Sequence, residues 1–584
     1  MCGIFGYIGK KSNAAEIVFD GLKALEYRGY DSWGVAVGGH SLISEKHTGK
    51  IGKASVLLPE STFAIGHTRW ATHGGVTVAN AHPHSSCDAQ ITLVHNGIVE
   101  NYQELKKAFK NKHKIKSETD TEIIAHLIEE ELEGEEFIEA VRSSFNKLKG
   151  LNAIAVLSKD GEIVVAKNGS PIVLGVGKDE CFLSSDPSAL LPYTKQVIFL
   201  EDGQMATLNK DGVNVFSLKT AKKIIPDVQT LQWKVADIST GKFPHFLIKE
   251  IYEQPKVIAN VAESLAGPAK DLAKTIKNAH GTFLVASGTA FHACLAGTYL
   301  FSKIAGHHLN TTVASEFNYL EDFINEKSLV VALSQSGETI DVIEPLGRAE
   351  RKGAKIASVV NTLGSTIYRM GDMKVLLGAG PEIAVCSTKA YIAKVSFLLL
   401  VAYSLIGEAE KARGLLKKAT VEVSRLLKPE TTRSVKKLAK ILKGAEHIYT
   451  IGRGLSYATA LESALKIKEV SYIHTEGLAG GELKHGTIAL ISKGTPCIVF
   501  APDDESYEAI ISNATEIKSR GGLIIVVSPK NSEAFDYWIQ VRDVGDANLI
   551  PMAIPAQLLT YYLAIEKGLD PDKPRNLAKS VTVK

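Results

Sequence analysis

The chain has 584 residues, so it is too long for a single small module and is expected to hold about three or four domains. Hydrophobic residues account for 45% and charged residues for 22%, which excludes disorder of the chain as a whole. Lysine and arginine exceed aspartate and glutamate by 67 − 64 = 3, and this near balance does not favour a nucleic-acid or membrane-surface protein.

The apolar runs and the cysteines together predict a soluble, cytoplasmic protein. The N-terminus, MCGIFGYIGKKS, lacks a basic run ahead of an apolar stretch, so no signal peptide is expected. The most apolar run, 395–406, is too short to cross a bilayer and predicts a buried helix. The six cysteines lie far apart with no CxxC pair, which is typical of a reducing compartment.

Short apolar runs bounded by turn residues dominate the chain up to about residue 210. The predicted strands are 63–66, 91–94, 153–157 and 197–200, and the predicted helices are 14–25 and 121–132. This pattern indicates layered β-sheets with helices outside them. From 217 to 244 the rhythm is lost, and the segment is predicted to be a linker.

Beyond the linker, strands alternate with helices, and the series occurs twice. The predicted strands are 283–286, 329–333 and 356–360, then 447–451, 497–500 and 523–527. Corresponding strands are offset by roughly 165 residues, which predicts a duplicated unit with a parallel sheet and flanking helices. Ligands of such sheets bind beyond the carboxyl ends of the strands.

Cys2 is a candidate nucleophile. It lies between Met1 and Gly3, a context that permits removal of the initiator methionine and leaves a free α-amine beside the thiol. An amine with a pKa of about 8 can act as general base for a neighbouring nucleophile. The alternative is a small buried hydrophobe, which is the commoner role of a lone cysteine.

Three further segments supply groups suited to an amide substrate. Arg69, in HTRWATHG, offers a guanidinium fork that can grip a carboxylate. Asn96 and Gly97 end a predicted strand with an amide donor and a flexible N–H, the parts of an oxyanion hole. Asp120, in SETDTE before a predicted helix, can receive an ammonium group.

These segments, with MCGIFGYIG, LEYRGYDS and NAHPH, resemble the glutaminase domain of the glutamine–fructose-6-phosphate aminotransferase (isomerizing) family. The resemblance continues through KEIYEQP, ALSQSGET, CSTKA, LESALKIKEVSYIH, GELKHG and PRNLAKSVTV, and so covers nearly the whole chain. It implies an N-terminal-nucleophile glutaminase domain with αββα layers, followed by two duplicated sugar isomerase (SIS) parallel α/β domains. The expected parts are 1–216 glutaminase, 217–244 linker, 245–425 and 426–570 sugar isomerase domains, and 571–584 active-site tail.

The resemblance implies that Cys2 hydrolyses glutamine through a thioester and that the ammonia converts fructose 6-phosphate to glucosamine 6-phosphate. This is the first step of UDP-N-acetylglucosamine synthesis in the family. The implied glutamine-site residues are the nucleophile Cys2, the oxyanion-hole residues Asn96 and Gly97, and the binding residues Arg69, Thr72, His73 and Asp120. Trp70 and the C-terminal segment are the implied gate for ammonia.

The segment 334–339, SQSGET, follows an apolar strand and predicts a phosphate site. Its hydroxyls and N–H groups lie at an expected helix N-terminus, where the dipole favours an anion. The alternative is an ordinary Ser-rich capping turn. Because no GxxxxGK[ST] is present, a nucleotide is not implied.

Glu462, Lys466 and Glu469 stand at i, i+4 and i+7 and share one helix face. Such spacing commonly marks a solvated, salt-bridged stripe. The resemblance implies instead that the stripe lines the sugar site and that Glu469 moves a proton between C1 and C2. It further implies that His485 opens the sugar ring from the neighbouring subunit of a homodimer and that Lys579 forms a Schiff base. The implied sugar-phosphate residues are Thr289, Ser334, Gln335, Ser336, Thr339, Val385, Lys466 and Ala578.

Two positions depart from the family pattern. Ala290 stands where a serine is usual, which removes one hydroxyl expected to contact the sugar phosphate, and Trp33 replaces a small residue. No cofactor or metal is expected, because an imine and a carboxylate suffice for the chemistry. The cluster His67, His73, His82, His84 and His95 lacks helical i, i+4 pairing and cysteine partners.

Two other functions are compatible with parts of this sequence. An amidophosphoribosyltransferase has a similar N-terminal half, but it needs a loop of paired acidic residues after a strand, and the sequence has none. A sugar-phosphate sensor that binds without turnover has no use for Cys2, Glu469, His485 and Lys579 together. The expected partners are therefore glutamine, fructose 6-phosphate and a second copy of the chain, with no nucleic acid and no membrane.

Overall fold

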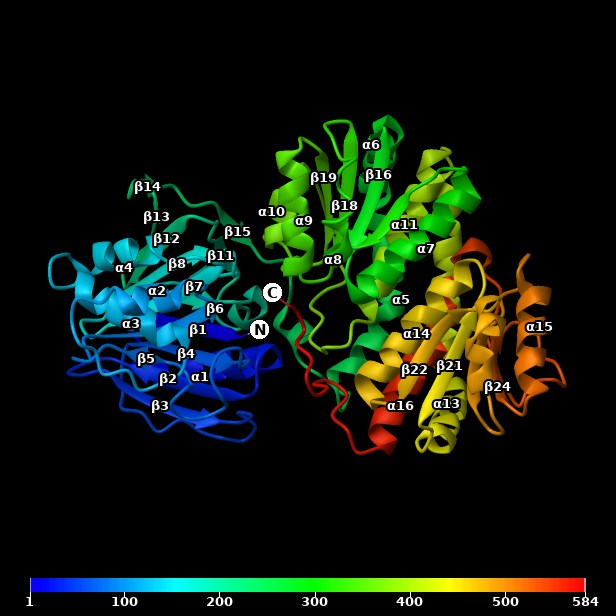
Figure 1. The fold of residues 1–584 in the computed structure, drawn as a ribbon, viewed down its shortest axis with the longest axis horizontal. Helices are drawn as coiled ribbons and strands as arrows, with labels where there is room; N and C mark the ends of the chain where they lie inside the picture. The colour runs from blue at the N-terminus through cyan, green and yellow to red at the C-terminus, as the bar shows by residue number, and fades with distance from the viewer. Residues whose placement is uncertain (1, 582–584) are drawn as a thin grey trace. The chain divides into compact units, whose positions relative to one another are not determined.

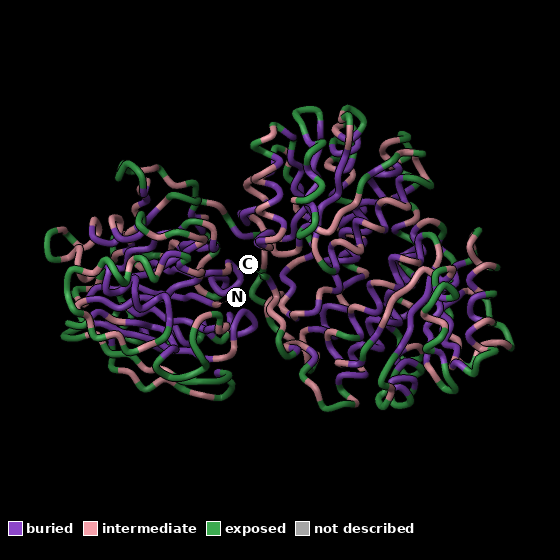
Figure 2. Tube along the Cα trace, in the orientation of Figure 1, coloured by how far each residue is buried: buried purple, intermediate pink, exposed green. Residues whose placement is uncertain are grey.

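The computed structural model describes residues 2–581, which divide into two compact units (Figure 1). The first unit holds residues 2–238 and 578–581, and the second holds residues 239–577. In both units the strands are largely buried and most connecting loops are exposed (Figure 2).

Two antiparallel sheets form the middle of the first unit. The larger has the order β15-β11-β9-β10-β1-β4-β2-β3, and the smaller has the order β14-β13-β12-β8-β7-β6-β5. The larger sheet consists of β1 (Gly3–Gly9), β2 (Ser32–Val37), β3 (Ile43–Thr48), β4 (Phe63–Arg69), β9 (Val173–Val176), β10 (Glu180–Ser184), β11 (Gln196–Phe199) and β15 (Val228–Thr230). The smaller consists of β5 (His84–Ser85), β6 (Ile91–Gly97), β7 (Asn152–Ser158), β8 (Ile163–Asn168), β12 (Gln204–Asn209), β13 (Gly212–Ser217) and β14 (Lys223–Ile224).

Helices cover the outer faces of the two sheets and complete four layers. The helix α1 (Ala14–Leu25) packs on β1 and β4, whereas α3 (Asp120–Glu131) and α4 (Phe137–Asn146) pack on the smaller sheet. The short α2 (Tyr102–Lys107) precedes α3. Ile4, Ile65 and Val165 are among the buried side chains between the sheets. The predicted αββα layers are therefore confirmed.

The strands read as continuous apolar runs because each sheet has the other sheet on one face and helices on the opposite face. The predicted strands 63–66, 91–94, 153–157 and 197–200 correspond to β4, β6, β7 and β11. The segment 217–244, predicted to be a linker, contains β14 and β15, which pair with β13 and β11.

Two five-stranded parallel sheets organise the second unit, and their strand orders correspond. They are β17-β16-β18-β19-β20 and β22-β21-β23-β24-β25. The first consists of β16 (Gly281–Ala286), β17 (Asn310–Val313), β18 (Ser328–Ser334), β19 (Lys355–Val360) and β20 (Met373–Leu376). The second consists of β21 (His447–Gly452), β22 (His474–Ala479), β23 (Pro496–Phe500), β24 (Leu523–Ser528) and β25 (Tyr537–Gln540). The predicted duplication is confirmed.

Helices surround both parallel sheets, and one apolar core joins them. Leu284 of β16 and Ile448 of β21 belong to the same buried cluster. The helices associated with the first sheet are α5 (Phe246–Ser264), α6 (Ala266–Asn278), α7 (Gly288–Ala305), α8 (Ala314–Phe317), α9 (Ile340–Arg351), α10 (Thr366–Met370) and α11 (Lys389–Leu405). The remaining helices are α12 (Ala409–Leu426), α13 (Pro429–Leu442), α14 (Leu455–Ser471), α15 (Tyr507–Lys518) and α16 (Leu549–Glu566).

The most apolar helices lie inside this core. Among the described residues, one segment, Gly545–Glu566, has the length and composition of a membrane span, but 89% of its apolar window is buried. It includes α16, which packs against α13 and α14. The apolar run at 395–406 lies almost wholly within α11, whose residues are buried from Lys389 to Tyr403. The predicted buried helix is confirmed.

Candidate active sites

The thiol of Cys2 lies beside the backbone of Trp70 in the first unit. Cys2 immediately precedes β1, and β1 pairs with β4, whose last residue is Arg69. The Trp70 N–H donates to Sγ of Cys2 at 3.3 Å. Burial raises the pKa of the Cys2 thiol above its ordinary value, although Trp70, Arg69 and Arg28 act in the opposite direction. The thiol therefore needs a base to become a nucleophile.

The side chain of Asn96 is aimed at Cys2 from the other sheet. Its Nδ2 donates to the Cys2 carbonyl oxygen at 3.2 Å. His67 Nε2 lies 3.1 Å from Asn96 Oδ1 and 3.0 Å from the His95 carbonyl oxygen. Both neighbours are acceptors, so Nε2 of His67 carries the proton. The hydrogen bond from His67 to Asn96 Oδ1 directs the Asn96 amide nitrogen toward Cys2.

Gly97 ends β6 beside Asn96. Its φ is +142°, and a Cβ there would lie 2.2 Å from the Leu151 carbonyl oxygen. Because no side chain fits, this position favours glycine and keeps the backbone next to Asn96 open. The structure thus brings Cys2, Asn96 and Gly97 to one end of the paired sheets, as a thiol site with an oxyanion hole requires.

Arg69 shapes the loop that follows β4. Its guanidinium donates to the carbonyl oxygens of Gly74 at 3.3 Å and Gly75 at 3.2 Å, and also to that of His73. Arg69 is buried, whereas Thr72 is exposed and His73 is half-buried. The His73 ring meets Tyr102 edge to face at 5.9 Å. A ligand carboxylate would therefore compete with loop carbonyls for this guanidinium.

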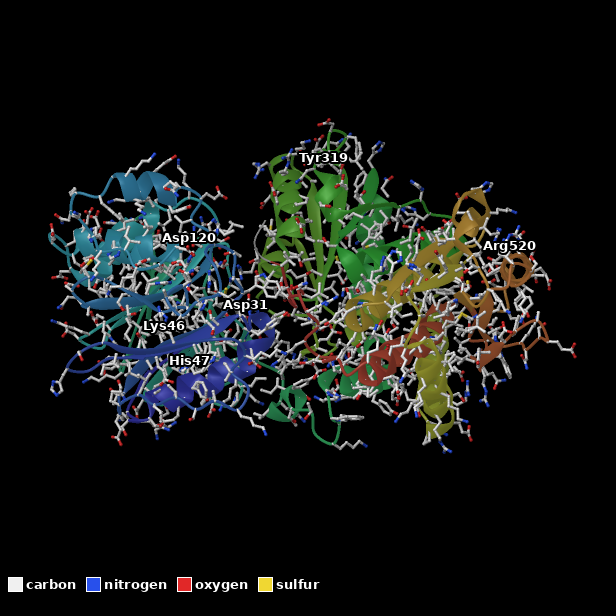
Figure 3. The ribbon with its side chains drawn as sticks, turned by 60° about the horizontal axis from the view of Figure 1, so that its bottom comes forward. Asp31, Lys46, His47, Asp120, Tyr319 and Arg520 are labelled. Atoms are coloured by element: carbon white, nitrogen blue, oxygen red, sulfur yellow. The ribbon has the colours of Figure 1, made fainter. Side chains whose placement is uncertain are left out.

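Asp120 is the first residue of α3, in the first unit (Figure 3). Thr119 caps this helix by accepting the Glu122 N–H. The Asp120 carboxylate is buried and accepts the Val99 N–H at 2.7 Å. Val99 lies two residues beyond Gly97, so this bond ties the start of α3 to the segment after β6.

The segment 334–339 forms a tight turn between β18 and α9 in the second unit. Ser334 Oγ accepts the Gly337 N–H at 3.0 Å, and Ser336 Oγ accepts the Glu338 N–H at 3.2 Å. Gln335 and Thr339 are half-buried, and Thr339 immediately precedes α9. The turn lies at the carboxyl end of a central parallel strand, where small anionic ligands bind in such folds.

A buried ionic cluster links α14 with α7. Lys466 Nζ lies 2.7 Å from Thr289 Oγ1, 2.8 Å from Glu469 Oε2 and 3.6 Å from Glu462 Oε1. Thr289 donates to Glu462 Oε1 at 3.2 Å. The side chains of Lys466 and Glu462 are 2% and 1% exposed, so the interpretation as a solvated stripe is wrong. Despite its burial, the Lys466 pKa lies well above its ordinary value, raised by Cys386 and the two carboxylates.

The remaining predicted residues are distributed over both units. Val385 is half-buried, and its N–H donates to the Asp572 carbonyl oxygen at 3.0 Å. His485 is exposed at the end of the short 3-10 helix Glu482–His485. Ala578 and Lys579 belong to the first unit, whereas the turn 334–339 and the ionic cluster belong to the second. Trp70 meets Tyr30 edge to face at 5.6 Å.

Several residues that contact and position the site residues were not predicted from the sequence. Arg28 Nε donates to the Cys2 carbonyl oxygen at 3.3 Å, and its guanidinium pairs with Asp186 at 3.1 Å. His292 Nδ1 lies 2.8 Å from Glu462 Oε2. His292 follows Thr289 by three residues on α7, so both side chains lie on one helix face. This spacing could have indicated that His292 belongs to the same site as Thr289. Trp33 is buried and stacks on His47 at 4.5 Å, so it serves the core.

Comparison with known proteins assigns families to both halves. The glutamine amidotransferase domain family matches residues 52–243, and the SIS domain family matches residues 275–404 and 441–567. The SIS domain family matches the chain twice, in agreement with the duplicated parallel sheets.

Full-length relatives carry both halves in the same order. A glutamine–fructose-6-phosphate aminotransferase (isomerizing) of Thermococcus kodakarensis is 44% identical, and one of Aquifex aeolicus is 41% identical, each over 100% of both chains. A solved C-terminal domain of glucosamine-fructose-6-phosphate aminotransferase from Francisella tularensis is 31% identical, with a TM-score of 0.54, and covers 57% of this chain and 99% of its own.

Proposed function

The chain belongs to the glutamine–fructose-6-phosphate aminotransferase (isomerizing) family, and from this premise we propose which of its residues carry out the two reactions. It hydrolyses glutamine and uses the nitrogen in an isomerizing amino transfer that converts fructose 6-phosphate to glucosamine 6-phosphate. The observation that carries the assignment is the presence, in one chain, of a thiol that accepts the Trp70 N–H beside the Asn96 amide, and of a buried Lys–Glu cluster in the sugar isomerase half.

In the glutaminase reaction, the Cys2 sulfur attacks the side-chain amide carbon of glutamine. The α-amine of Cys2, free once Met1 is removed, takes the thiol proton and passes it to the leaving nitrogen, so that ammonia departs and a thioester remains. Water then hydrolyses the thioester to glutamate and restores the thiol. The raised pKa of the Cys2 thiol supports the need for this base. Asn96 Nδ2 and the Gly97 N–H stabilise the oxyanion.

The substrate glutamine is held at its other end by Arg69 and Asp120. The guanidinium takes the α-carboxylate and the Asp120 carboxylate takes the α-ammonium, with Thr72 and His73 closing over the ligand. The buried guanidinium already donates to the carbonyl oxygens at 73–75. Carboxylate binding would therefore reorganise this loop, which also follows Trp70, the proposed gate for ammonia on its way to the sugar.

In the sugar reaction, the phosphate of fructose 6-phosphate binds in the turn between β18 and α9. Ser334, Gln335, Ser336 and Thr339 supply hydroxyl, amide and backbone donors at the helix N-terminus. Thr289, Val385, Lys466 and Ala578 complete the proposed sugar-phosphate site. The N–H of Gly337 and the hydroxyl of Ser334 already form a compact turn there. Ala290 supplies no hydroxyl, so the phosphate relies on the remaining donors.

Isomerization requires an open-chain sugar and a mobile proton. Lys579 condenses with the C2 carbonyl to form an imine and releases water, and ammonia later displaces the lysine. Glu469 moves a proton from C1 to C2, and its 2.8 Å ion pair with Lys466 orients the carboxylate. His485 assists ring opening from the second subunit of a homodimer, consistent with its exposure in a single chain.

The proposed parts are a glutaminase domain (1–216), a linker (217–244), two sugar isomerase domains (245–425 and 426–570) and an active-site tail (571–584). None of the six cysteines, all within the described residues, forms a disulfide, which supports a cytoplasmic, reducing location. No nucleic acid, membrane or cofactor enters the proposed reactions.

The test replaces Glu469 with glutamine, which keeps the shape of the side chain and removes the base. Turnover of fructose 6-phosphate is expected to fall by roughly 10²–10⁴-fold, while fructose 6-phosphate affinity changes little because the turn at 334–339 holds the phosphate. Glu446→Gln, at an exposed position, is the matched control. Equal loss of turnover and affinity would make Glu469 a binding residue, and no loss would remove it from the mechanism.

A further inference from the structure

A second group of reactive side chains lies in the first unit, away from the thiol site. Cys87, His113, His126 and Glu129 each offer one ligand atom, and the four atoms lie within 4.8 Å of one another. Cys87 follows β5, His113 lies in the loop between α2 and α3, and His126 and Glu129 are one turn apart on α3. The cluster therefore joins three separate segments of the chain.

The sulfur–nitrogen distances suit a tetrahedral cation. Cys87 Sγ lies 3.8 Å from His113 Nδ1 and 3.7 Å from His126 Nδ1. Tetrahedral zinc, with Zn–S of about 2.3 Å and Zn–N of about 2.0 Å, separates sulfur from nitrogen by about 3.6 Å. Glu129 Oε2 lies 2.8 Å from His126 Nδ1 and 3.1 Å from His113 Nδ1. One carboxylate oxygen thus faces both nitrogens.

The far sides of both imidazoles face carboxylates. His113 Nε2 lies 3.3 Å from Glu130 Oε1, and that oxygen is fixed by the Lys110 and Asn111 N–H groups at 2.6 and 2.8 Å. His126 Nε2 lies 3.8 Å from Glu122 Oε1. On His113 the hydrogen-bonded carboxylate holds a proton on the outer nitrogen and leaves the Nδ1 lone pair for a metal, which is the usual surrounding of a zinc-binding histidine. The contact of His126 with Glu122 is longer than a hydrogen bond.

The ligand types select the cation. One thiolate and two imidazoles are soft or borderline donors, which favour Zn²⁺ over Mg²⁺ or Ca²⁺. A thiolate and a carboxylate together neutralise a divalent ion, and the side chains of His113 and His126 are only 4% and 1% exposed. Four protein ligands leave no open position, which is typical of a structural site.

We propose that Cys87, His113, His126 and Glu129 bind one Zn²⁺ ion as a structural centre of the first unit. Binding releases the Cys87 thiol proton and joins the loop that contains His113 to α3. Because Asp120 begins α3, the metal also fixes the helix that carries this residue. The proposal revises the expectation of a metal-free chain and is independent of the proposed reactions.

The test is a Co²⁺ titration of the full chain in a Cys2→Ala background, which removes the only other cysteine that is not buried. One cobalt ion per chain with a thiolate-to-cobalt charge-transfer band is expected, and zinc should displace it. Cys87→Ser should abolish the band and weaken binding at least tenfold. His40→Ala, at an exposed histidine elsewhere, should change neither. Binding without the band, or equal binding by Cys87→Ser, would overturn the proposal.

A second variant distinguishes loss of the metal site from misfolding of Cys87→Ser. Glu130→Gln leaves all four ligands in place, keeps an oxygen for the Lys110 and Asn111 N–H groups and removes the carboxylate charge behind His113, so cobalt affinity should fall by about 10–100-fold with an unchanged circular dichroism spectrum. Zinc should raise the thermal midpoint of the Cys2→Ala chain but not that of the Cys87→Ser chain. The proposed zinc site is wrong if zinc raises both midpoints equally, or if Glu130→Gln binds cobalt as tightly as its parent.

Discussion

His67 fixes the direction in which the Asn96 amide points. Its Nε2–H donates to Asn96 Oδ1 at 3.1 Å, which leaves Asn96 Nδ2 to donate to the Cys2 carbonyl oxygen at 3.2 Å. A reversed amide would place two acceptors, Asn96 Oδ1 and the Cys2 carbonyl oxygen, against each other. His67 is therefore a positioning residue for the proposed oxyanion hole, although it does not touch Cys2 through any described hydrogen bond.

Replacement of His67 by alanine should lower kcat for glutamine hydrolysis with little change in KM. Loss of an oxyanion-hole donor costs roughly 10²–10³-fold in kcat, and loss of its orientation should cost part of that. His67→Gln, whose amide can still donate to Asn96, should recover part of the rate. Steady-state glutaminase assays measure both constants.

The double variant His67→Ala with Asn96→Ala separates positioning from general damage. If His67 acts only through Asn96, the double variant should be no slower than Asn96→Ala alone. Independent, multiplying losses would show that His67 has another role.

The buried histidines should stay neutral at acidic pH. Burial lowers the pKa of His67 to about 3 and lowers that of the neighbouring His82 well below 6.5. Their contribution to stability is complete above the unfolded value of about 6.5 and is lost as the pH falls toward 3, at about 1.4 kcal/mol per pH unit per histidine. Thermal unfolding between pH 7.5 and 5 should show a falling midpoint for the first unit. A ring titration of His67 near pH 6.5 by NMR would contradict this.

The Lys466 ammonium should be essential to the stability of the second unit. Lys466→Met leaves the carboxylates of Glu462 and Glu469 without their shared cation, and breaking such a buried group typically costs about 3–5 kcal/mol. The double variant Lys466→Met with Glu462→Gln removes one of the stranded charges and should recover part of the loss. Denaturant unfolding measures both. A single variant as stable as the parent would mean that the cluster is hydrated.

Gly337 should be required for sugar-phosphate binding. Its φ is +68°, and a Cβ would lie 2.0 Å from Ser365 Oγ, so Gly337→Ala must deform the turn. KM for fructose 6-phosphate should rise about tenfold or more, while glutaminase activity is kept. Gly353→Ala is the matched control, since its φ is +80° but its nearest contact is 3.4 Å. It should lose stability without a change in KM, and equal KM changes would refute the role of the turn.

Helices and turns with a clear local residue pattern could be predicted from the sequence. The run 14–25 has helical periodicity and forms α1 over the same residues. The turn at 334–339 was predicted at the end of a strand because polar residues follow an apolar run, and Ser334 does end β18. The approach of Asn96 to Cys2 required the family resemblance, because the two residues are distant in the chain.

Burial and long-range convergence were less accessible to sequence reasoning. The spacing of Glu462, Lys466 and Glu469 is the same for a solvated stripe and for a buried cluster, and only the packing of α14 against α7 decides between them. Cys87 and His113 carry no spacing signal, because they reach His126 through separate loops. The spacing of His292 from Thr289 places both on one helix face, but its ion pair with Glu462 of another helix is seen only in the structure.

The transfer of ¹⁵N from amide-labelled glutamine to the sugar product is the most direct test of the coupled reaction. The full chain, given labelled glutamine and fructose 6-phosphate, should form ¹⁵N-glucosamine 6-phosphate and glutamate in equal amounts, even with unlabelled ammonium in the solution. Cys2→Ala should form neither product from glutamine and still bind fructose 6-phosphate. Labelled sugar formed by Cys2→Ala, or labelled ammonia released by the parent chain with no label in the sugar, would contradict the account.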